Sequence, residues 1–320
     1  MAANEDRDQP SAEAKPWAIE THSIRKVYGR QVALDDLSLH ASRGEVFGFL
    51  GPNGAGKTTA LKILLGLASP TSGTARVLEH PVGDREVRRQ IGYLPEHFQF
   101  PDWLTGRELV DVHARLAGLS GGERREQVPI ALAAVGLTEA AGRQLGTYSK
   151  GMLQRIGLAQ AIVHQPAVVF LDEPTSALDP VGWRDVRDLI GRLRDAGATV
   201  FLNSHLLGEV ELVCDRVAIV NRGRVVRSGS LSALLAGEHE LRLTVDAATS
   251  ELVAALGAWG TVERLGERDL RLTTAGPEAA PAVAAAVVGQ GRQLYALVPD
   301  HRSLEDVFLG AVTAADGPTS

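Results

Sequence analysis

The stretch Gly51-Pro52-Asn53-Gly54-Ala55-Gly56-Lys57-Thr58-Thr59 indicates the fold class of this chain. It fits the pattern G-x-x-x-x-G-K-[S/T], in which glycines let backbone N–H groups close around phosphate oxygens. An apolar run, Val46 to Leu50, precedes it, and the helix predicted to follow adds a partial positive charge. The alternative is a glycine turn that binds no ligand, but such a turn would not need a strand before it and a helix after it. We therefore expect Lys57 to reach the β- and γ-phosphates of a nucleotide and the Thr58 hydroxyl to ligate Mg²⁺.

Other apolar runs predict a sheet of mostly parallel strands, covered on both faces. The runs are residues 46–50, 167–171 and 199–202. Residues 217–220 and 224–226, separated by Asn221-Arg222-Gly223, predict a hairpin. The fold class is therefore α/β with a mixed sheet, and a mostly helical subdomain is expected over about 97–165.

A change in composition after Gly237 predicts a second, small α+β domain over residues 238–313. Its segments follow the order β-α-β-β-α-β, typical of a ferredoxin-like fold. They are residues 241–245, 250–259, 261–265, 270–273, 277–288 and 293–298, followed by a helix over 303–312. Residues 17–236 then form the first domain, and residues 1–16 and 314–320 are expected to be tails, the first of them disordered.

Composition excludes several classes of protein. The 320 residues carry 33 Lys and Arg against 39 Asp and Glu, and the resulting charge of −6 argues against a nucleic-acid partner. The one cysteine, Cys214, excludes a disulfide framework and is expected to be buried. We find no run of about 20 apolar residues and no apolar stretch near Met1. We therefore expect a cytoplasmic chain that serves any membrane process through a partner.

Asp172-Glu173 follows the apolar run that ends at Leu171. Such a pair is often only solvated, but open α/β sheets bind ligands at the carboxyl ends of their strands, where the phosphate loop also lies. Successive strand residues point to opposite sides, so the two carboxylates can have different tasks. We expect Asp172 to hold Mg²⁺ through a water molecule, and Glu173 to orient and deprotonate the water that attacks the γ-phosphate.

Further segments, in a fixed order, make residues 17 to about 235 similar to the ATP-binding subunits of ABC transporters. Tyr148-Ser149-Lys150-Gly151-Met152-Leu153-Gln154-Arg155 resembles the signature motif of that family, and Ser176-Ala177-Leu178-Asp179 resembles its D-loop. His205 lies where the family has its switch histidine, and Tyr28 lies where an aromatic ring stacks on adenine. The resemblance implies a P-loop NTPase of the ABC type that binds ATP and Mg²⁺.

The resemblance also implies that the signature binds the γ-phosphate of a nucleotide held by another subunit. The residues by themselves allow this, because Ser149 is a plausible N-cap of a helix whose N-terminus can bind an anion. The site of one copy would then be completed by Ser149, Gly151, Met152 and Asp179 of a second copy in a symmetric head-to-tail dimer. For Tyr28 an ordinary packing role is the alternative. For His205 the alternative to a γ-phosphate contact is a partly buried structural histidine.

Two departures from the family pattern stand out. Lys150 replaces the first glycine of the usual Ser-Gly-Gly-Gln, and Met152 replaces its glutamine, as in export-type ATPases that pair with separate permeases. Glu96 occupies the place of a glutamine that contacts Mg²⁺ and couples the site to the permease, with Gln99 as a possible replacement if the loop is shifted. A carboxylate is a better ligand for a hard cation than an amide, so Glu96 can still ligate Mg²⁺.

Taken together, these patterns predict an ATPase subunit, bound at the cytoplasmic face of the membrane, that drives a separate membrane permease for export. By resemblance, the helical subdomain receives the permease, and Phe98, Phe100 and Trp103 either dock it or simply pack the subdomain. The segment 303–309 resembles a C-terminal motif of drug- and lipid-export ATPases. The alternatives are an import ATPase, a soluble ABC ATPase acting on ribosomes or DNA, and a regulator that binds nucleotide without hydrolysis.

Overall fold

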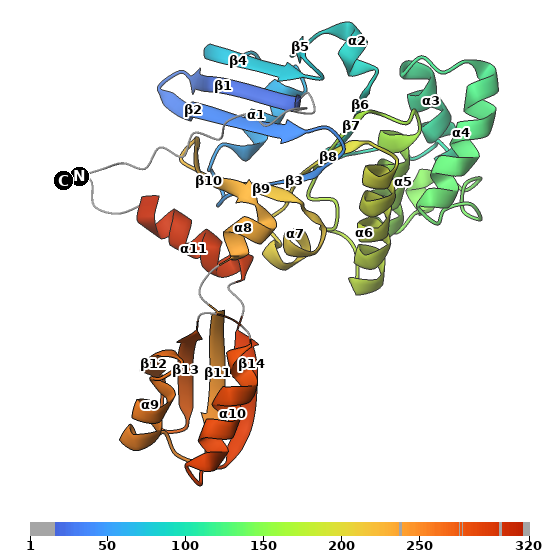
Figure 1. Cartoon of the computed structure of the whole chain (residues 1–320). Coiled ribbons are helices and arrows are strands. Elements are labelled where there is room, and N and C mark those ends of the chain that lie inside the picture. The colour runs from blue at the N-terminus through green and yellow to red at the C-terminus, as the bar shows by residue number, and fades with distance from the viewer. Residues whose placement is uncertain (1–16, 237–238, 275, 277, 301–302, 316–320) are drawn as a thin grey trace. The chain divides into compact units, whose positions relative to one another are not determined.

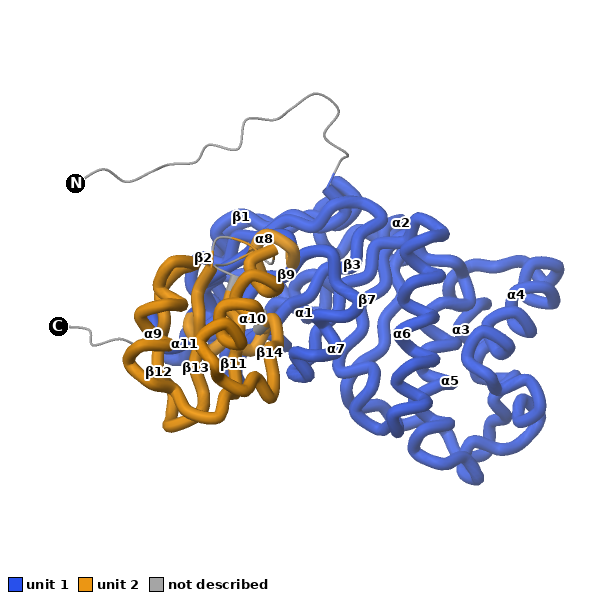
Figure 2. The backbone as a smooth tube through the Cα atoms, turned by 60° about the horizontal axis from the view of Figure 1, so that its bottom comes forward, with its two compact units in different colours: residues 1–230, 311–320 blue, residues 231–310 orange. Residues whose placement is uncertain are grey.

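The computed structural model describes residues 17–236, 239–274, 276, 278–300 and 303–315. The tail predicted over 1–16, and residues 316–320 of the other, lie outside the described residues. The chain forms two compact units, one up to Ser230 together with the residues from Ala311 on, and one over Leu231–Gly310 (Figure 2). This division falls a few residues before the domain boundary predicted near residue 237, which itself lies outside the described residues.

Two sheets make up the first unit (Figure 1). The antiparallel sheet has the order β2-β1-β4-β5, with β1 (Trp17–Tyr28), β2 (Gln31–Ser42), β4 (Ser72–Val77) and β5 (His80–Pro81). The second sheet has the order β10-β9-β3-β8-β7-β6. Its strands are β3 (Val46–Leu50), β6 (Ile91–Leu94), β7 (Val168–Asp172), β8 (Thr199–Asn203), β9 (Arg216–Asn221) and β10 (Arg224–Ser230). Neighbouring strands are parallel except for the predicted hairpin, β9–β10, so the mixed sheet is confirmed.

The central strands are buried along their whole length. Every residue of β3, β7 and β8 is buried, as expected for apolar strands with both faces covered. Phe47, Phe49 and Phe170 surround Phe201, with ring centroids 5.2–5.7 Å from that of Phe201. This packing fixes the parallel strands, so that the carboxyl ends of β3, β7 and β8 meet at one edge.

The helices of the first unit fall into two sets. The first set contains α1 (Lys57–Leu64), α2 (Arg85–Arg88), α6 (Pro180–Asp195) and α7 (Leu207–Val213). The helical subdomain contains α3 (Gly106–Leu116), α4 (Gly121–Ala134), a 3₁₀ turn (Leu145–Thr147) and α5 (Lys150–Ile162), grouped at one side of the unit in Figure 1. Capping boxes begin two of these helices, Thr105 with Glu108 at α3 and Ser120 with Glu123 at α4.

The second unit is an antiparallel sheet with its own apolar core. It contains α8 (Leu231–Leu235), β11 (His239–Val245), α9 (Ser250–Leu256), β12 (Gly260–Arg264), β13 (Asp269–Thr274), α10 (Ala279–Gly289) and β14 (Leu294–Asp300), and α11 (Leu304–Ala315) follows. The sheet order is β12-β13-β11-β14, and Leu241 and Leu243 share a core with Leu252 of α9 and Val283 of α10. The predicted β-α-β-β-α-β order is confirmed. Among the described helices of the chain, none combines the length and apolar character needed to cross a bilayer.

Candidate functional site

The phosphate loop is a tight turn between β3 and α1. A Cβ atom on Gly51 would lie 2.3 Å from the carbonyl oxygen of Val220, so only glycine fits there. Gly56, the N-cap of α1, has a φ of 103°, a conformation open to glycine but strained for other residues. The loop is closed by hydrogen bonds from Ala55 N to Pro52 O, at 3.1 Å, and from Gly223 N to Ala55 O, at 2.8 Å. Its backbone is therefore arranged before any ligand arrives.

Lys57 lies across this loop at the first position of α1. Its Nζ donates to the carbonyl oxygens of Gly51 at 2.6 Å and Pro52 at 3.3 Å. Burial lowers the pKa of Lys57, while the negative charges of Glu173, Asp172 and Glu96 raise it in part. The lysine and these carboxylates thus share one site. Thr58, the next residue, is exposed in the first turn of α1.

Asp172 is the last residue of β7, and its carboxylate is buried beside the end of β8. Asp172 and Asn203 are register partners, and Asn203 Nδ2 donates to Asp172 Oδ1. Burial raises the pKa of Asp172, and the nearby charge of Glu96 also raises it, while the hydrogen bond from Asn203 lowers it. The other amide atom, Asn203 Oδ1, is buried without a hydrogen-bond partner among the described residues.

Glu173 follows with a φ of 50°, a left-handed conformation that is uncommon for a residue with a side chain. Its N–H donates to Asn203 O at 2.8 Å, and its Oε2 lies 2.7 Å from His205 Nδ1. The carboxylate side chain is only 9% exposed. Burial raises the pKa of Glu173, and the hydrogen bond from His205 lowers it. A buried carboxylate with a raised pKa, oriented by a histidine, is the arrangement expected of a general base.

The signature residues lie away from this loop. Ser149 is the N-cap of α5 and accepts a hydrogen bond from Met152 N at 3.2 Å. A Cβ on Gly151 would lie 3.5 Å from Leu178 Cδ2, so the start of α5 lies against the segment before α6. In both Figure 1 and Figure 2, α5 is well separated from α1. Lys57, at the start of α1, therefore shares its site with the carboxylates, whereas the signature contacts the backbone of Glu173 and Pro174 through Gln154 and lies on a helix apart from α1.

Residues 34–176 match the ABC transporter family. An ABC transporter ATP-binding protein of Nostoc is 45% identical over 233 residues, which cover 70% of each chain. The chain belongs to the ABC transporter ATP-binding proteins. ATP hydrolysis is the activity of this family, so the P-loop site described above belongs to an ATPase.

Further relatives of this ABC ATPase are named for a task. The daunorubicin/doxorubicin resistance ATP-binding protein of Streptomyces peucetius is 40% identical, covering 74% of this chain and 73% of that protein. The Nod factor export ATP-binding protein I of Paraburkholderia xenovorans is 39% identical, covering 69% and 73%. Among solved structures, an ATP-binding cassette in a dimeric post-hydrolysis state with ADP and Pi is 27% identical, with a TM-score of 0.62, over 67% of this chain and 98% of that one.

Three other predicted site residues of the ABC ATPase lie at the margins. Tyr28 ends β1 with its ring 47% exposed and Lys26 Nζ 4.8 Å from the ring centroid, so it is not a packed core residue. Glu96 is exposed in the loop after β6. Asp179 caps α6, its Oδ1 accepting from Gly182 N at 2.8 Å. In one copy, the side chain of Asp179 is therefore engaged in a helix cap.

Two residues that hold the Asp172–Pro174 segment of the ABC ATPase were not predicted from the sequence. Asn203 binds Asp172, and it could have been found as the polar residue that ends an apolar strand beside β7. Gln154 donates to the carbonyl oxygen of Pro174 at 2.9 Å and approaches that of Glu173 at 3.4 Å. No sequence signal indicates this second contact, because it joins two segments that only the fold brings together.

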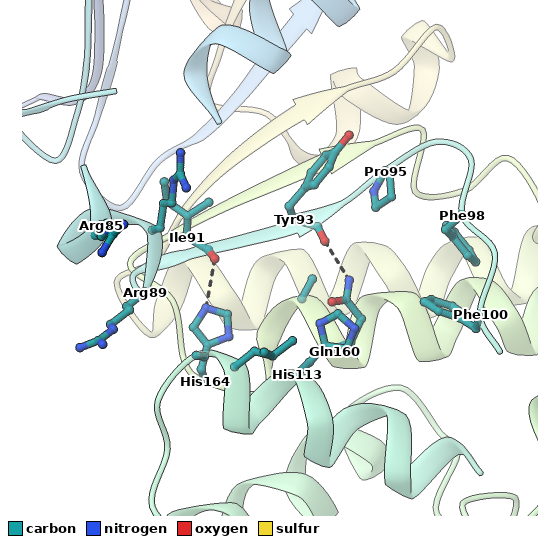
Figure 3. Close-up of a pocket in the computed structure, with 14 residues that line it drawn as sticks. Arg85, Arg89, Ile91, Tyr93, Pro95, Phe98, Phe100, His113, Gln160 and His164 are labelled. Carbon is teal, nitrogen blue, oxygen red and sulfur yellow. Dashed lines mark hydrogen bonds between the residues drawn. The ribbon is translucent and has the colours of Figure 1, made fainter. Parts of the chain in front are cut away.

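A groove of about 690 Å³ lies where α2, β6 and the helical subdomain of the ABC ATPase meet (Figure 3). Arg85 and Arg89 lie at one end, and Phe98 and Phe100, 4.9 Å apart between ring centroids, lie at the other. The remaining lining residues include Arg88, Leu116, His113 and His164, and none is a carboxylate. Burial lowers the pKa of both histidines, which favours their neutral forms, so the positive charge of the groove is concentrated at its arginine end.

Replacing His205 with alanine is expected to shift the pH dependence of ATP hydrolysis. The hydrogen bond from His205 lowers the pKa of Glu173, so its loss raises that pKa further. The base is then protonated at a higher pH, and the acid limb of kcat moves upward. Profiles of kcat against pH for both proteins, at saturating Mg²⁺-ATP, test this. An acid limb at the same pH in both would show that the ion pair does not control the base.

Proposed function

We propose that the chain works as a pair of copies that bind two ATP molecules head to tail and drive a separate membrane permease, for export, from the cytoplasmic face of the membrane. One observation carries the pairing. Helix α5, which begins at Lys150 with Ser149 as its N-cap, lies apart from α1, which begins at Lys57 at the end of the phosphate loop (Figure 1). A second copy, related by a two-fold axis, supplies each loop with the missing signature. The dimeric state of a structural relative is consistent with this pairing.

In the proposed reaction, the loop backbone and Lys57 hold the phosphates while a water attacks the γ-phosphorus. A bond forms from the water oxygen to phosphorus, and the bond from phosphorus to the bridging oxygen of ADP breaks. Glu173 takes a proton from the water, and ADP keeps the electron pair of the broken bond. His205 holds Glu173 in place through its 2.7 Å contact and is expected to contact the γ-phosphate. Loss of the shared γ-phosphates then reopens the pair.

The residues present fit Mg²⁺. Thr58 and Asp172 offer hydroxyl and carboxylate oxygens, the ligands that this hard cation prefers, and Glu96 is near enough to raise the pKa of Asp172. The buried, unpartnered Asn203 Oδ1 suits a water bound to the cation. Among the described residues no cluster of three or more Asp, Glu, His or Cys could hold a metal alone. This agrees with a cation held largely by nucleotide phosphates, whose negative charge it would neutralise.

Export is the proposed direction because relatives over most of this chain carry drug-resistance and export names. We propose that the permease docks in the groove of Figure 3. The arginine end of the groove fits a carboxylate, and Phe98 and Phe100 fit an apolar side chain at the opposite end of the docked segment. The expected partner element is therefore a short helix of the permease with an acidic and an apolar end.

The double variant Arg85→Glu/Arg89→Glu is expected to lose the permease and keep its own ATPase activity. The chain is co-expressed with a permease identified by copurification from membranes, and the pair is purified in detergent through a tag on the permease. Recovery of the ATPase should fall at least tenfold, because like charges at an interface cost several kcal/mol. An acidic residue of the permease changed to Arg should restore it. Unchanged recovery of the double variant would contradict docking at this groove.

A further inference from the structure

Gln154 connects the signature helix to the backbone of Glu173. Its side chain is 2% exposed, and its Nε2 donates to Pro174 O at 2.9 Å and approaches Glu173 O at 3.4 Å. It lies on α5, little more than one turn after Ser149. A buried amide with donors aimed at two successive carbonyl oxygens holds the peptide between them in a fixed orientation.

The held peptide is strained. Glu173 has a φ of 50°, a left-handed conformation that is unfavourable for a residue with a side chain. On its amino side the peptide is held by the bond from Glu173 N to Asn203 O, at 2.8 Å. On its carboxyl side Ser176 N donates to Glu173 O at 3.3 Å, and Gln154 binds the same carbonyl and the next one. Removing Gln154 leaves the carboxyl side of this peptide held by the long bond from Ser176 N, at 3.3 Å, so that the Glu173 side chain can turn with the peptide.

We propose that Gln154 is a positioning residue that holds Glu173 in its hydrolytic orientation and makes that orientation depend on how α5 is seated. The inference rests on the proposed function, in which the start of α5 contacts the nucleotide of the second copy. One helix then contacts the ATP of one site through Ser149 and Gly151 and the base of the other site through Gln154. The position of the signature helix on the nucleotide of one site is thus coupled to the orientation of the base in the other site.

Gln154→Met tests the proposal, because methionine has a similar length and no donor. We expect kcat for ATP hydrolysis to fall at least about tenfold, since small misplacements of catalytic groups have effects of this size or larger. KM for ATP should change less than about twofold. Gln154→Asn keeps the amide, but its side chain is one methylene shorter and cannot reach the same carbonyl oxygens. It should also lower kcat with little change in KM. It provides a second test if the methionine variant does not fold.

Gln160→Met is the matched control. Gln160 is on the same helix, is 8% exposed, and donates from Nε2 to Tyr93 O at 2.8 Å. It lines the groove of Figure 3, so kcat is compared in the chain without the permease. Each methionine variant loses one buried hydrogen bond shorter than 3 Å to a carbonyl, and Gln154→Met loses a 3.4 Å contact as well, so comparable decreases in melting temperature are expected. The kcat of Gln154→Met should lie at least about tenfold below that of Gln160→Met. Equal values of kcat would overturn the proposal and leave Gln154 a packing residue.

A second measurement separates this inference from the proposed function. In a Glu173→Gln background, size-exclusion chromatography with light scattering follows the dimer formed with Mg²⁺-ATP. Adding Gln154→Met should leave that dimer intact, because the amide acts on the base and not on the contact between copies. If Glu173→Gln alone forms no dimer, the proposed function fails. If the dimer forms and Gln154→Met retains its kcat, only the role of Gln154 fails.

Discussion

We expect Glu173→Gln to lower the rate of ATP hydrolysis by about 10²- to 10⁴-fold and to leave ATP binding intact. This is the range that a positioned general base contributes. The amide has nearly the shape of the carboxylate and keeps an oxygen and a nitrogen near His205, but it cannot take a proton from water. The side chain is only 9% exposed, so bulk water has little access to replace it as the base. The phosphate loop is untouched, and affinity for ATP should change little.

The same variant should accumulate as an ATP-bound dimer. Turnover is measured by phosphate release, ATP binding by equilibrium titration, and dimer formation by light scattering. Glu209→Gln is the control, since Glu209 Oε2 accepts from Thr175 Oγ1 at 2.6 Å and a glutamine oxygen can still accept there. Normal hydrolysis by Glu173→Gln would remove Glu173 as the base. Tight ATP binding without any dimer would contradict the pairing of two copies.

The raised pKa of Glu173 also predicts how the stability of Glu173→Gln depends on pH. Burial raises the pKa of Glu173, so the folded protein favours the protonated carboxyl more than the unfolded chain does. This lowers stability at pH values above the folded pKa and has no effect below the ordinary glutamate pKa. Glutamine carries no such penalty. At pH 8 the melting temperature of Glu173→Gln should therefore be no lower than that of the wild type, and any gain should vanish as pH falls.

The parts of the site that the sequence could predict are those built from neighbouring residues. The phosphate loop needs a strand, glycines and a helix start within a short segment, and each of these is visible in the residues themselves. The second unit was predictable for a related reason, because alternation of Leu241 and Leu243 with polar residues marks a strand covered on one face. Local patterns of this kind report local geometry.

The parts that escaped prediction depend on which strands and helices become neighbours. Asn203 meets Asp172 only because β8 lies beside β7 in the sheet. Gln154 contacts Glu173 because the fold places α5 beside the segment that follows β7. The left-handed φ of Glu173 could not be predicted, because this position is not a glycine. In the sequence, nothing distinguishes Arg85 and Arg89 from other charged surface residues. Only the fold places Phe98 at the opposite end of the same groove. The capping role of Asp179, by contrast, could have been predicted from neighbouring residues, because Asp before Pro180 is typical of a helix start.

Lys57→Met should weaken ATP binding by at least about 10- to 100-fold, since a hydrogen bond to a charged group is worth roughly 1.5–3 kcal/mol. The ammonium of Lys57 donates to Gly51 O and Pro52 O, so it holds the loop as well as supplying charge. It also faces Asp172, Glu173 and Glu96, and its loss leaves these carboxylates without the nearest cation. The phosphates would then meet an acidic site with a less ordered loop. Both effects oppose binding of an anion.

Lys62→Met provides the comparison, because Lys62 is an exposed residue of the same helix and its loss changes the net charge equally. Titration with ATP at two salt concentrations distinguishes the two effects on Lys57→Met. A loss of affinity that disappears at high salt would reflect long-range charge alone, and both lysine variants should then behave alike. A loss confined to Lys57→Met and retained at high salt would reflect direct contact with the phosphates. Unchanged affinity in Lys57→Met would refute the assignment of this loop, since a lysine inside the phosphate site cannot be removed without consequence.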